Sequence, residues 1–510
     1  MAPRSPSLET VSELAERHGF DLTPEEIATY RDVMAHTLEV LGRLDELPPA
    51  PRPEVRYPRT PGYRPGPEEN RYGAWYWRCS IDGAPDGPLA GKTVAIKDSI
   101  CVAGVPMMNG SSLLEGFVPE VDATVVTRIL DAGGQIVGKA ACEHLCVSDS
   151  SNTSDCGPVL NPYDTARSAG GSSSGSAVAV ATGDCDLALG ADQAGSIRMP
   201  AAWCGIYGLK PSYGLVPYTG CASIEYTLDH VGPMAASVRD IALLLGAIAG
   251  PDDFDPRQAG VVADDYLAQL DAGIEGMRVG VLEEGFGWPG AEEEVESAVR
   301  SAADRLRELG ATVEAVSVPL HRDSAAIWRG IGVEGNLLRQ FRGSLVATGS
   351  RAWYDVALHD AFGRARARNA NDLAHTAKSI ALSGAYLHER YGGRFYAKAR
   401  NLVPLLTRAY DDALAQHDVL LMPATPMRPT LLPGPEASLA DLIRHAFEVN
   451  ASVCGFNLTG HPGISIPIGP SGGLPIGLMA IGGRFADAQL LRFAQACEQS
   501  IATPVVAPAG

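Results

Sequence analysis

A lysine and two serines, each set among small or apolar residues, are the most chemically suggestive feature of the sequence. Ser172 lies in the run GGSSSGS, a glycine–serine loop that leads into a helix of small residues, and Ser196 ends the small-residue turn QAGS. A serine on such a turn has backbone N–H groups close by. These donors can bind the negative oxygen of a tetrahedral intermediate. The two serines are therefore candidates for nucleophilic chemistry on a carbonyl group.

Lys97 closes the β-type run KTVAIK at residues 92–97. An apolar strand would desolvate its ammonium group and favour the neutral amine, which can act as a base. Together with the serines, it predicts a serine hydrolase whose nucleophile is activated by a lysine. Glycine–serine loops also bind anions or only form turns, so the residues by themselves leave these interpretations open.

Two short matches to other kinds of site lack the further motifs that such sites require. The run VAIK at 94–97 and the run HRD at 321–323 resemble parts of a protein kinase, but no glycine-rich loop precedes Lys97 and no DFG follows. The run CEHLC at 142–146 could suggest a metal. A structural zinc site normally has four ligands in paired short spacings. No second pair is evident, so we expect no metal here and a buried helix or strand segment instead.

The run GSSSG at 171–175 fits the nucleophile-elbow pattern GxSxG and makes Ser173 an alternative nucleophile. An elbow needs a strand directly before its serine, whereas residues 162–170 have the composition of a loop. We therefore favour Ser196 over Ser173.

Three longer runs make the chain resemble the amidase signature enzymes over roughly residues 87–500. They are GGSSSGSA, ALGADQAGSIRMPAAWCGIYGLKP and VAIKDSICVAGVPMMNGS, and their order and spacing fit the family. The helical N-terminus and the DQ-AGS turn are most similar to bacterial amidases of nitrile-degradation pathways, which hydrolyse aliphatic and aromatic primary amides.

The resemblance implies a Ser–cis-Ser–Lys triad without metal or cofactor. Ser196 would be the nucleophile, Ser172 the bridging serine and Lys97 the terminal base. Other implied roles are a cis peptide bond from Gly171 to Ser172, an oxyanion hole from the amides of Gln193, Ala194, Gly195 and Ser196, a supporting hydrogen bond from Ser173, and a structural ion pair between Asp192 and Arg198. We expect His230 to be structural.

The resemblance also places residues 147–149 near the substrate. The expected pocket residues are Val147, Ser148, Asp149, Leu228 and Trp328. Related enzymes tend to have phenylalanine and then glycines where this chain has Val147, Asp149 and Ser150. A smaller Val147 would widen the pocket and Asp149 would add negative charge, which suggests a substrate with an amine or hydroxyl group. Alternatively, Asp149 points to solvent.

Composition narrows the class of partner. The chain has 510 residues, 41 Lys plus Arg against 60 Asp plus Glu, and a formal charge of −19. Such a surface repels phosphate backbones and anionic lipids, so we expect neither a nucleic-acid nor a membrane partner. The N-terminus does not have the pattern of a signal peptide. The ten cysteines form no disulfide framework, and we therefore expect free thiols and a cytoplasmic location.

The alternation of β-type and helical runs predicts an α/β fold, with a mixed central β-sheet sandwiched between helices and an N-terminal helical arm. We expect the arm at residues 1–47, a proline-rich linker at 48–86 and the catalytic domain at 87–510, in which 255–415 is a helical, substrate-covering segment. The expected enzyme is an amidohydrolase that cleaves a primary, small or aromatic carboxylic amide through a Ser196 acyl-enzyme. We expect it to be a homodimer. An esterase or acyltransferase using the same acyl-enzyme, or a catalytically dead scaffold, are the alternatives.

Overall fold

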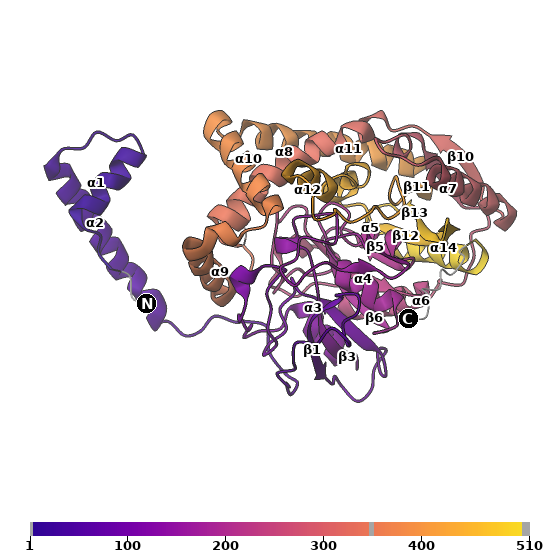
Figure 1. The fold of residues 1–510 in the computed structure, drawn as a ribbon, viewed down its shortest axis with the longest axis horizontal. Helices are drawn as coiled ribbons and strands as arrows, with labels where there is room; N and C mark the ends of the chain where they lie inside the picture. Colours follow the sequence, from indigo (N-terminus) through magenta and orange to yellow (C-terminus); the bar gives the residue numbers. More distant parts are fainter. Residues whose placement is uncertain (1–3, 346–350, 502–510) are drawn as a thin grey trace. The chain divides into compact units, whose positions relative to one another are not determined.

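The N-terminal arm is a pair of helices. The computed structural model describes residues 4–345 and 351–501, and the chain divides into two compact units, residues 1–52 and 53–510. In the first unit, α1 (Leu8–Arg17) packs against α2 (Pro24–Gly42) (Figure 1). Thr23 and Glu26 form a capping box at the start of α2, where Pro24 presets the helical φ angle. Both helices fall within the helical arm expected at residues 1–47.

A mixed sheet forms the centre of the second unit. In the described residues it has 11 strands in the order β1-β3-β2-β6-β8-β7-β12-β13-β11-β9-β10. The strands are β1 (Trp75–Ile81), β2 (Thr93–Lys97), β3 (Gln135–Ala140), β6 (Leu187–Asp192), β7 (Tyr207–Lys210), β8 (His230–Ala235), β9 (Arg278–Leu282), β10 (Thr312–Val316), β11 (Val419–Pro423), β12 (Gly463–Ser471) and β13 (Leu474–Ile481). A separate hairpin pairs β4 (Leu160–Asn161) with β5 (Asp164–Ser168). Because β2 pairs in parallel with β3 and β6, whereas β6 and β8 are antiparallel, the predicted mixed sheet is confirmed.

Helices cover both faces of this sheet. Successive side chains of a strand point to opposite faces. Val94 and Ile96 of β2 belong to a core cluster with residues of α3 (Thr124–Asp131) and α6 (Val238–Ile248). Ala95, between them, belongs to another cluster with residues of α4 (Ser174–Ala181) and α5 (Arg198–Trp203). Part of α5 also belongs to the first cluster. Helices α3 and α6 therefore pack on one face and α4 on the other, and the predicted sandwich is present.

The predicted helical segment at 255–415 is not wholly helical. Its helices are α7 (Glu293–Arg305), α8 (Ser324–Asn336), α9 (Val356–Asn369), α10 (His375–Tyr391) and α11 (Arg394–Gln416), and α8 packs against α10 and α11 (Figure 1). Strands β9 and β10 also lie in this segment and extend one edge of the main sheet. The chain continues through α12 (Leu439–Ala446), α13 (Gly455–Thr459) and α14 (Asp487–Ser500).

The predicted linker at 48–86 is too long. Its last part forms strand β1, which pairs antiparallel with β3 along the edge of the sheet. Trp75 and Tyr76 are buried there, because aromatic side chains on an edge strand bury a large apolar area. Among residues 4–345 and 351–501, no helix has both the length and the apolar character needed to cross a bilayer.

Candidate active site

Lys97 and Ser172 are in direct contact inside the second unit. Lys97 ends β2 and is fully buried. Its Nζ donates to Ser172 Oγ at 2.8 Å and to the carbonyl of Ala191, on the neighbouring strand β6, at 3.2 Å. The peptide bond from Gly171 to Ser172 is cis. An amine and a hydroxyl group at this distance can exchange a proton.

The turn that carries Ser196 lies against the serine loop. It follows β6 and precedes α5, and the backbone carbonyl of Ser196 accepts a hydrogen bond from the amide of Ser173 at 3.2 Å. Ser196 is only 4% exposed. The fold thus brings Lys97, Ser172 and the Ser196 turn together in one buried site.

An ion pair shapes the Ser196 turn. Arg198 donates from Nε and Nη2 to the two carboxylate oxygens of Asp192, each at 3.0 Å. The same carboxylate accepts the amides of Gly195 at 2.7 Å and Ile197 at 3.1 Å. Burial opposes ionisation of Asp192, but Arg198 outweighs it and the pKa of the carboxyl group is lowered. Asp192 is therefore a fixed negative charge that holds the turn closed.

The amides of this turn differ in their availability. Because Gly195 donates its N–H to Asp192, it does not present that donor to a substrate, which departs from the expected set of four. Within the described residues, the amides of Gln193, Ala194 and Ser196 have no hydrogen-bond partner in the protein. Gly195 has a φ of +124°, and a Cβ atom there would lie 2.6 Å from Cγ2 of Val453. The turn therefore requires glycine at this position.

Ser173 lacks the geometry of an elbow nucleophile. It is fully buried, and its hydroxyl both donates to the carbonyl of Ala191 and accepts from its amide, each at 3.2 Å. The preceding strand, β5, ends at Ser168, so a loop separates it from Ser173. Ser173 thus braces the serine loop against β6.

The expected pocket residues occupy different environments. Asp149 is 4% exposed, so the alternative that it points to solvent is wrong. Its carboxylate accepts from the backbone and side-chain nitrogens of Asn450 at 3.0 and 3.3 Å, and burial raises its pKa to about 7. Ser148 hydrogen-bonds Ser150 at 2.8 Å. Val147 lies in a core cluster, and Leu228 is fully buried in the largest core cluster.

Trp328 contacts the turn from α8. Its Nε1 donates to the carbonyl of Gln193 at 2.8 Å, and the Gln193 side chain donates from Nε2 to Tyr218 Oη at 3.0 Å. Gln193 is therefore held from two sides. Tyr218 is a supporting residue that no sequence pattern indicated.

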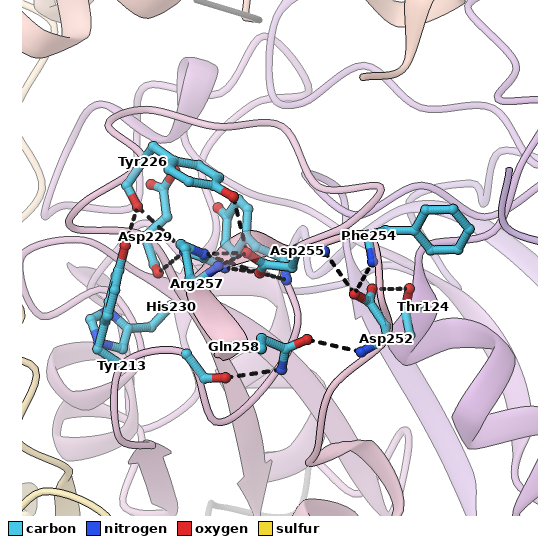
Figure 2. Close-up of polar contacts among 12 residues, drawn as sticks. Thr124, Tyr213, Tyr226, Asp229, His230, Asp252, Phe254, Asp255, Arg257 and Gln258 are labelled. Atoms are coloured by element: carbon cyan, nitrogen blue, oxygen red, sulfur yellow. Dashed lines mark hydrogen bonds and ion pairs between the residues drawn. The ribbon is translucent and has the colours of Figure 1, made fainter. Parts of the chain in front are cut away.

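A buried arginine fixes the loop that supplies Tyr218. Arg257 donates to Asp255 at 2.6 Å and to the carbonyl of Asp229 at 2.8 Å, and its guanidinium lies over the Tyr226 ring at 4.8 Å (Figure 2). Asp255 also accepts the amide of Tyr218 at 2.9 Å. No local sequence pattern indicates this cluster, because its members come from separate segments.

His230, which Figure 2 also labels, makes contacts that are typical of a structural residue. Its Nδ1 hydrogen-bonds the carbonyl of Leu228 at 2.7 Å, and its Nε2 lies 3.5 Å from Nζ of Lys210. Burial holds the pKa of His230 well below its usual value.

Glu143 is a second missed residue, within the run set aside as a possible metal site. Its carboxylate accepts from the amide and hydroxyl of Thr153 at 2.7 and 2.6 Å and from the hydroxyl of Ser174 at 3.2 Å. Its amide donates to the carbonyl of Ser172 at 3.3 Å. Burial raises the pKa of Glu143 to about 7. The available signal was an acid followed by a histidine between two cysteines.

Comparison with known proteins places the whole arrangement in one family. The family model described as Amidase matches residues 68–491. An enantioselective amidase of Rhodococcus rhodochrous is 42% identical over 99% of this chain and 97% of its own length. A glutamyl-tRNA(Gln) amidotransferase subunit of Halobacterium salinarum is 37% identical over 84% of this chain and 99% of its own length.

Solved structures agree. The native peptide amidase of Stenotrophomonas maltophilia superimposes with a TM-score of 0.68 at 31% identity, covering 83% of this chain and 85% of its own. The corresponding glutamyl-tRNA(Gln) amidotransferase subunit of Thermotoga maritima gives 0.69 at 32% identity, covering 84% and 88%. The chain therefore belongs to the amidase (amidase signature) family and is a hydrolase that acts on amide C–N bonds.

Proposed function

We propose that the chain hydrolyses small or aromatic primary carboxylic amides to the acid and ammonia through an acyl-enzyme on Ser196. The observation that carries the proposal is the buried 2.8 Å contact between Lys97 Nζ and Ser172 Oγ beside the Ser196 turn. It gives a serine nucleophile a route by which its proton can reach a base.

In the proposed reaction, Ser196 Oγ attacks the amide carbonyl while its proton passes to Ser172 Oγ, and the Ser172 proton passes to Lys97. The negative oxygen of the tetrahedral intermediate is bound by the amides of Gln193, Ala194 and Ser196. The protons then return through Ser172 to the leaving nitrogen, which departs as ammonia. Water then attacks the acyl-enzyme while its proton passes through Ser172 to Lys97. The relay returns a proton to Ser196 Oγ as the acid leaves. The groups that carry the proton and bind the negative oxygen in these steps all belong to the chain.

The acyl group is proposed to lie between Val147 and Trp328. Trp328 contacts the oxyanion turn through Gln193, so a rigid ring stands next to the reacting carbonyl. The similarity to an enantioselective amidase over 99% of this chain supports the proposal that a chiral carboxamide is hydrolysed with a preference for one enantiomer.

A free amidase is favoured over a component of an amidotransferase complex. The Rhodococcus amidase aligns with 99% of the chain, whereas the Halobacterium amidotransferase protein aligns with 84%. The formal charge of −19 also opposes contact with tRNA. An esterase or acyltransferase would use the same acyl-enzyme and differs only in the leaving group or the acceptor.

We further propose a domain division, an oligomeric state and a location. Residues 53–510 would be the catalytic unit. The helical arm exposes Val33, Val40 and Leu44 on α2 and the following turn, and burying such apolar side chains against a second copy would stabilise a homodimer. The ten free cysteines are compatible with the cytoplasm.

The test is ammonia release from aliphatic, aromatic and chiral primary amides by the wild type and Ser196→Ala. We expect release by the wild type and loss of activity in the variant, with each enantiomer assayed separately. Equal rates in both proteins would exclude Ser196 as the nucleophile. If the wild type is inactive on every amide but cleaves matching esters, the esterase alternative replaces the proposal.

A further inference from the structure

A pair of cysteines lies directly beside the Lys97–Ser172 contact and has no part in the proposed hydrolysis. Cys142 follows β3, and Cys146 ends the next short 3-10 turn. Both thiols point to the same atom, Oδ1 of Asn109, at 3.7 and 3.4 Å. The two side chains also contact each other in a small buried cluster with Ile224.

The backbone turns Cys146 toward the site. Its φ is +59°, and that of Leu145 is +50°. Non-glycine residues rarely adopt this left-handed region, and they cluster in functional parts of proteins when they do. In this conformation the Cys146 thiol faces the hydroxyl groups of Ser172 and Ser99.

The environment of Cys146 differs from that of every other cysteine in the chain. The adjacent Cys142 thiol is the largest cause that lowers the pKa of Cys146, and the Ser172 hydroxyl acts in the same direction. Burial raises the pKa of the other nine cysteines. The thiolate is the reactive form of cysteine, and Cys146 is the more exposed of the two residues, so oxidation would begin at Cys146.

Small oxidants can be expected to reach it. Cys146 is 7% exposed, against 4% for Ser196, which has to meet an amide substrate. Hydrogen peroxide is smaller than any amide. Cys142 is fully buried and is placed to react only with its neighbour.

We propose that Cys142 and Cys146 form an oxidation site for hydrogen peroxide, and that the resulting disulfide reversibly switches off the adjacent Lys97–Ser172 pair. The Cys146 thiolate attacks one oxygen of the peroxide, so an S–O bond forms, the O–O bond breaks and hydroxide leaves. The Cys142 sulfur then attacks the sulfenic acid, so the S–S bond forms, the S–O bond breaks and water leaves. The two thiols lose two electrons and two protons, and the peroxide is reduced to two water molecules.

Inactivation follows from what Cys146 touches. A disulfide draws its sulfur away from Ser172. Cys146 is also followed directly by the loop in which the carbonyl of Asp149 accepts the amide of Gly171 at 2.6 Å. A shift of this loop therefore displaces Ser172 through its neighbour Gly171. The loss of activity rests on the proposed function, whereas formation of the disulfide does not.

The experiment treats the full-length protein with hydrogen peroxide and follows both amidase activity and covalent state. Free thiols are blocked with iodoacetamide, and the protein is cut after Glu143, which separates Cys142 from Cys146 unless a disulfide joins them. For the wild type we expect linked fragments, lost activity, and recovery of both properties with dithiothreitol. Cys497→Ser, which removes a fully buried thiol on α14, is the matched control and should behave as the wild type.

Cys142→Ser separates the switch from general damage. This variant retains Cys146 but has no resolving thiol, so peroxide should oxidise Cys146 as far as the sulfinic acid, which dithiothreitol does not reverse. The proposal would be overturned if peroxide inactivated the wild type while Cys142 and Cys146 were recovered as separate, alkylated fragments. So would identical inactivation and recovery in Cys142→Ser. Linked fragments in a protein without amidase activity would leave the oxidation site standing and remove the proposed function instead.

Discussion

At the scale of single residues, the site depends on polar groups that the fold has removed from water. Lys97 is fully buried, and its amine donates to only two oxygens, Ser172 Oγ and the carbonyl of Ala191, among the described residues. A buried amine with so few partners interacts strongly with each of them, because competing water is excluded. The Ser172 hydroxyl is therefore the natural outlet for proton exchange with Lys97.

Replacing Ser172 tests this relay. Ser172→Ala should fold normally and lower kcat by about 10²- to 10⁴-fold, the usual contribution of a positioned acid–base group. Ser176→Ala is the control, because Ser176 is also a buried serine of this segment and donates at 2.9 Å to the carbonyl of Leu189 instead. Steady-state ammonia release and thermal melting measure the two effects. A Ser172→Ala enzyme that works at the control's rate would exclude the relay.

Glu143 gives the fold a defined response to pH. Burial raises its pKa from 4.5 to about 7, so the folded protein binds this proton more tightly than the unfolded chain does. The resulting contribution to stability is complete below about pH 4.5 and is lost as the pH rises through about 7. Asp149 contributes in the same direction, because burial raises its pKa as well.

Glu143→Gln removes the ionisation and keeps the shape of the side chain. We expect the free energy of unfolding of the variant to fall less steeply than that of the wild type between pH 4.5 and 7. Urea denaturation at several pH values measures the difference, and the Asp149 contribution cancels because both proteins contain it. Parallel curves for the two proteins would show that Glu143 titrates at its ordinary pKa.

At the scale of elements, the amides of the turn between β6 and α5 form two groups, those bonded to Asp192 and those left available. Asp192 takes the Gly195 and Ile197 amides and leaves Gln193, Ala194 and Ser196 available. Trp328 of α8 and Tyr218 hold Gln193. The proposed oxyanion donors are thus positioned by elements distant in sequence.

Gly195→Ala should damage this turn. Alanine strongly disfavours a φ of +124°, and its Cβ atom would lie 2.6 Å from Val453 Cγ2. The backbone strain alone amounts to about 1–3 kcal/mol. We expect a lower melting temperature and a kcat reduced by about tenfold or more, since 1.4 kcal/mol of transition-state stabilisation corresponds to a factor of ten.

Ala194→Gly provides the comparison at the neighbouring position. It keeps the backbone donor and introduces no clash, so its kcat should stay close to that of the wild type. Equal activity of Gly195→Ala and Ala194→Gly would show that the turn does not need its present conformation for catalysis.

At the scale of the whole molecule, the arm of residues 1–52 is a separate compact unit. On α2 and in the turn after it, Val33 is 57% and Leu44 is 63% exposed. Apolar side chains exposed together are typical of surfaces that bind another protein.

Sedimentation of the full chain and of Val33→Asp/Leu44→Asp tests the proposed dimer. We expect the full chain to sediment as a dimer and the double variant as a monomer, with unchanged turnover at saturating substrate, because neither residue belongs to the catalytic unit. A double variant that remains dimeric would remove the arm as the dimer surface. A monomeric wild type would remove the dimer itself.

Features that depend on short stretches of chain can be predicted from the order of the residues. Three features are local: the Thr23 capping box, the alternating runs of the sheet, and the motif runs around Lys97, Ser172 and Ser196. Their residue types and spacing therefore predict the helices, the mixed sheet and the family. The family assignment by comparison confirms that part. The catalytic roles of these residues stay predictions for the variants above.

Which polar groups are free and which are already hydrogen-bonded depends on contacts between distant parts of the folded chain. The Gly195 amide is already bound by Asp192, Asp149 is buried against Asn450, and β1 joins the sheet from within the predicted linker. Asp149 and Asn450 lie 301 residues apart in the chain. Hydrogen bonding and burial depend on such distant neighbours, and a local pattern carries no information about them.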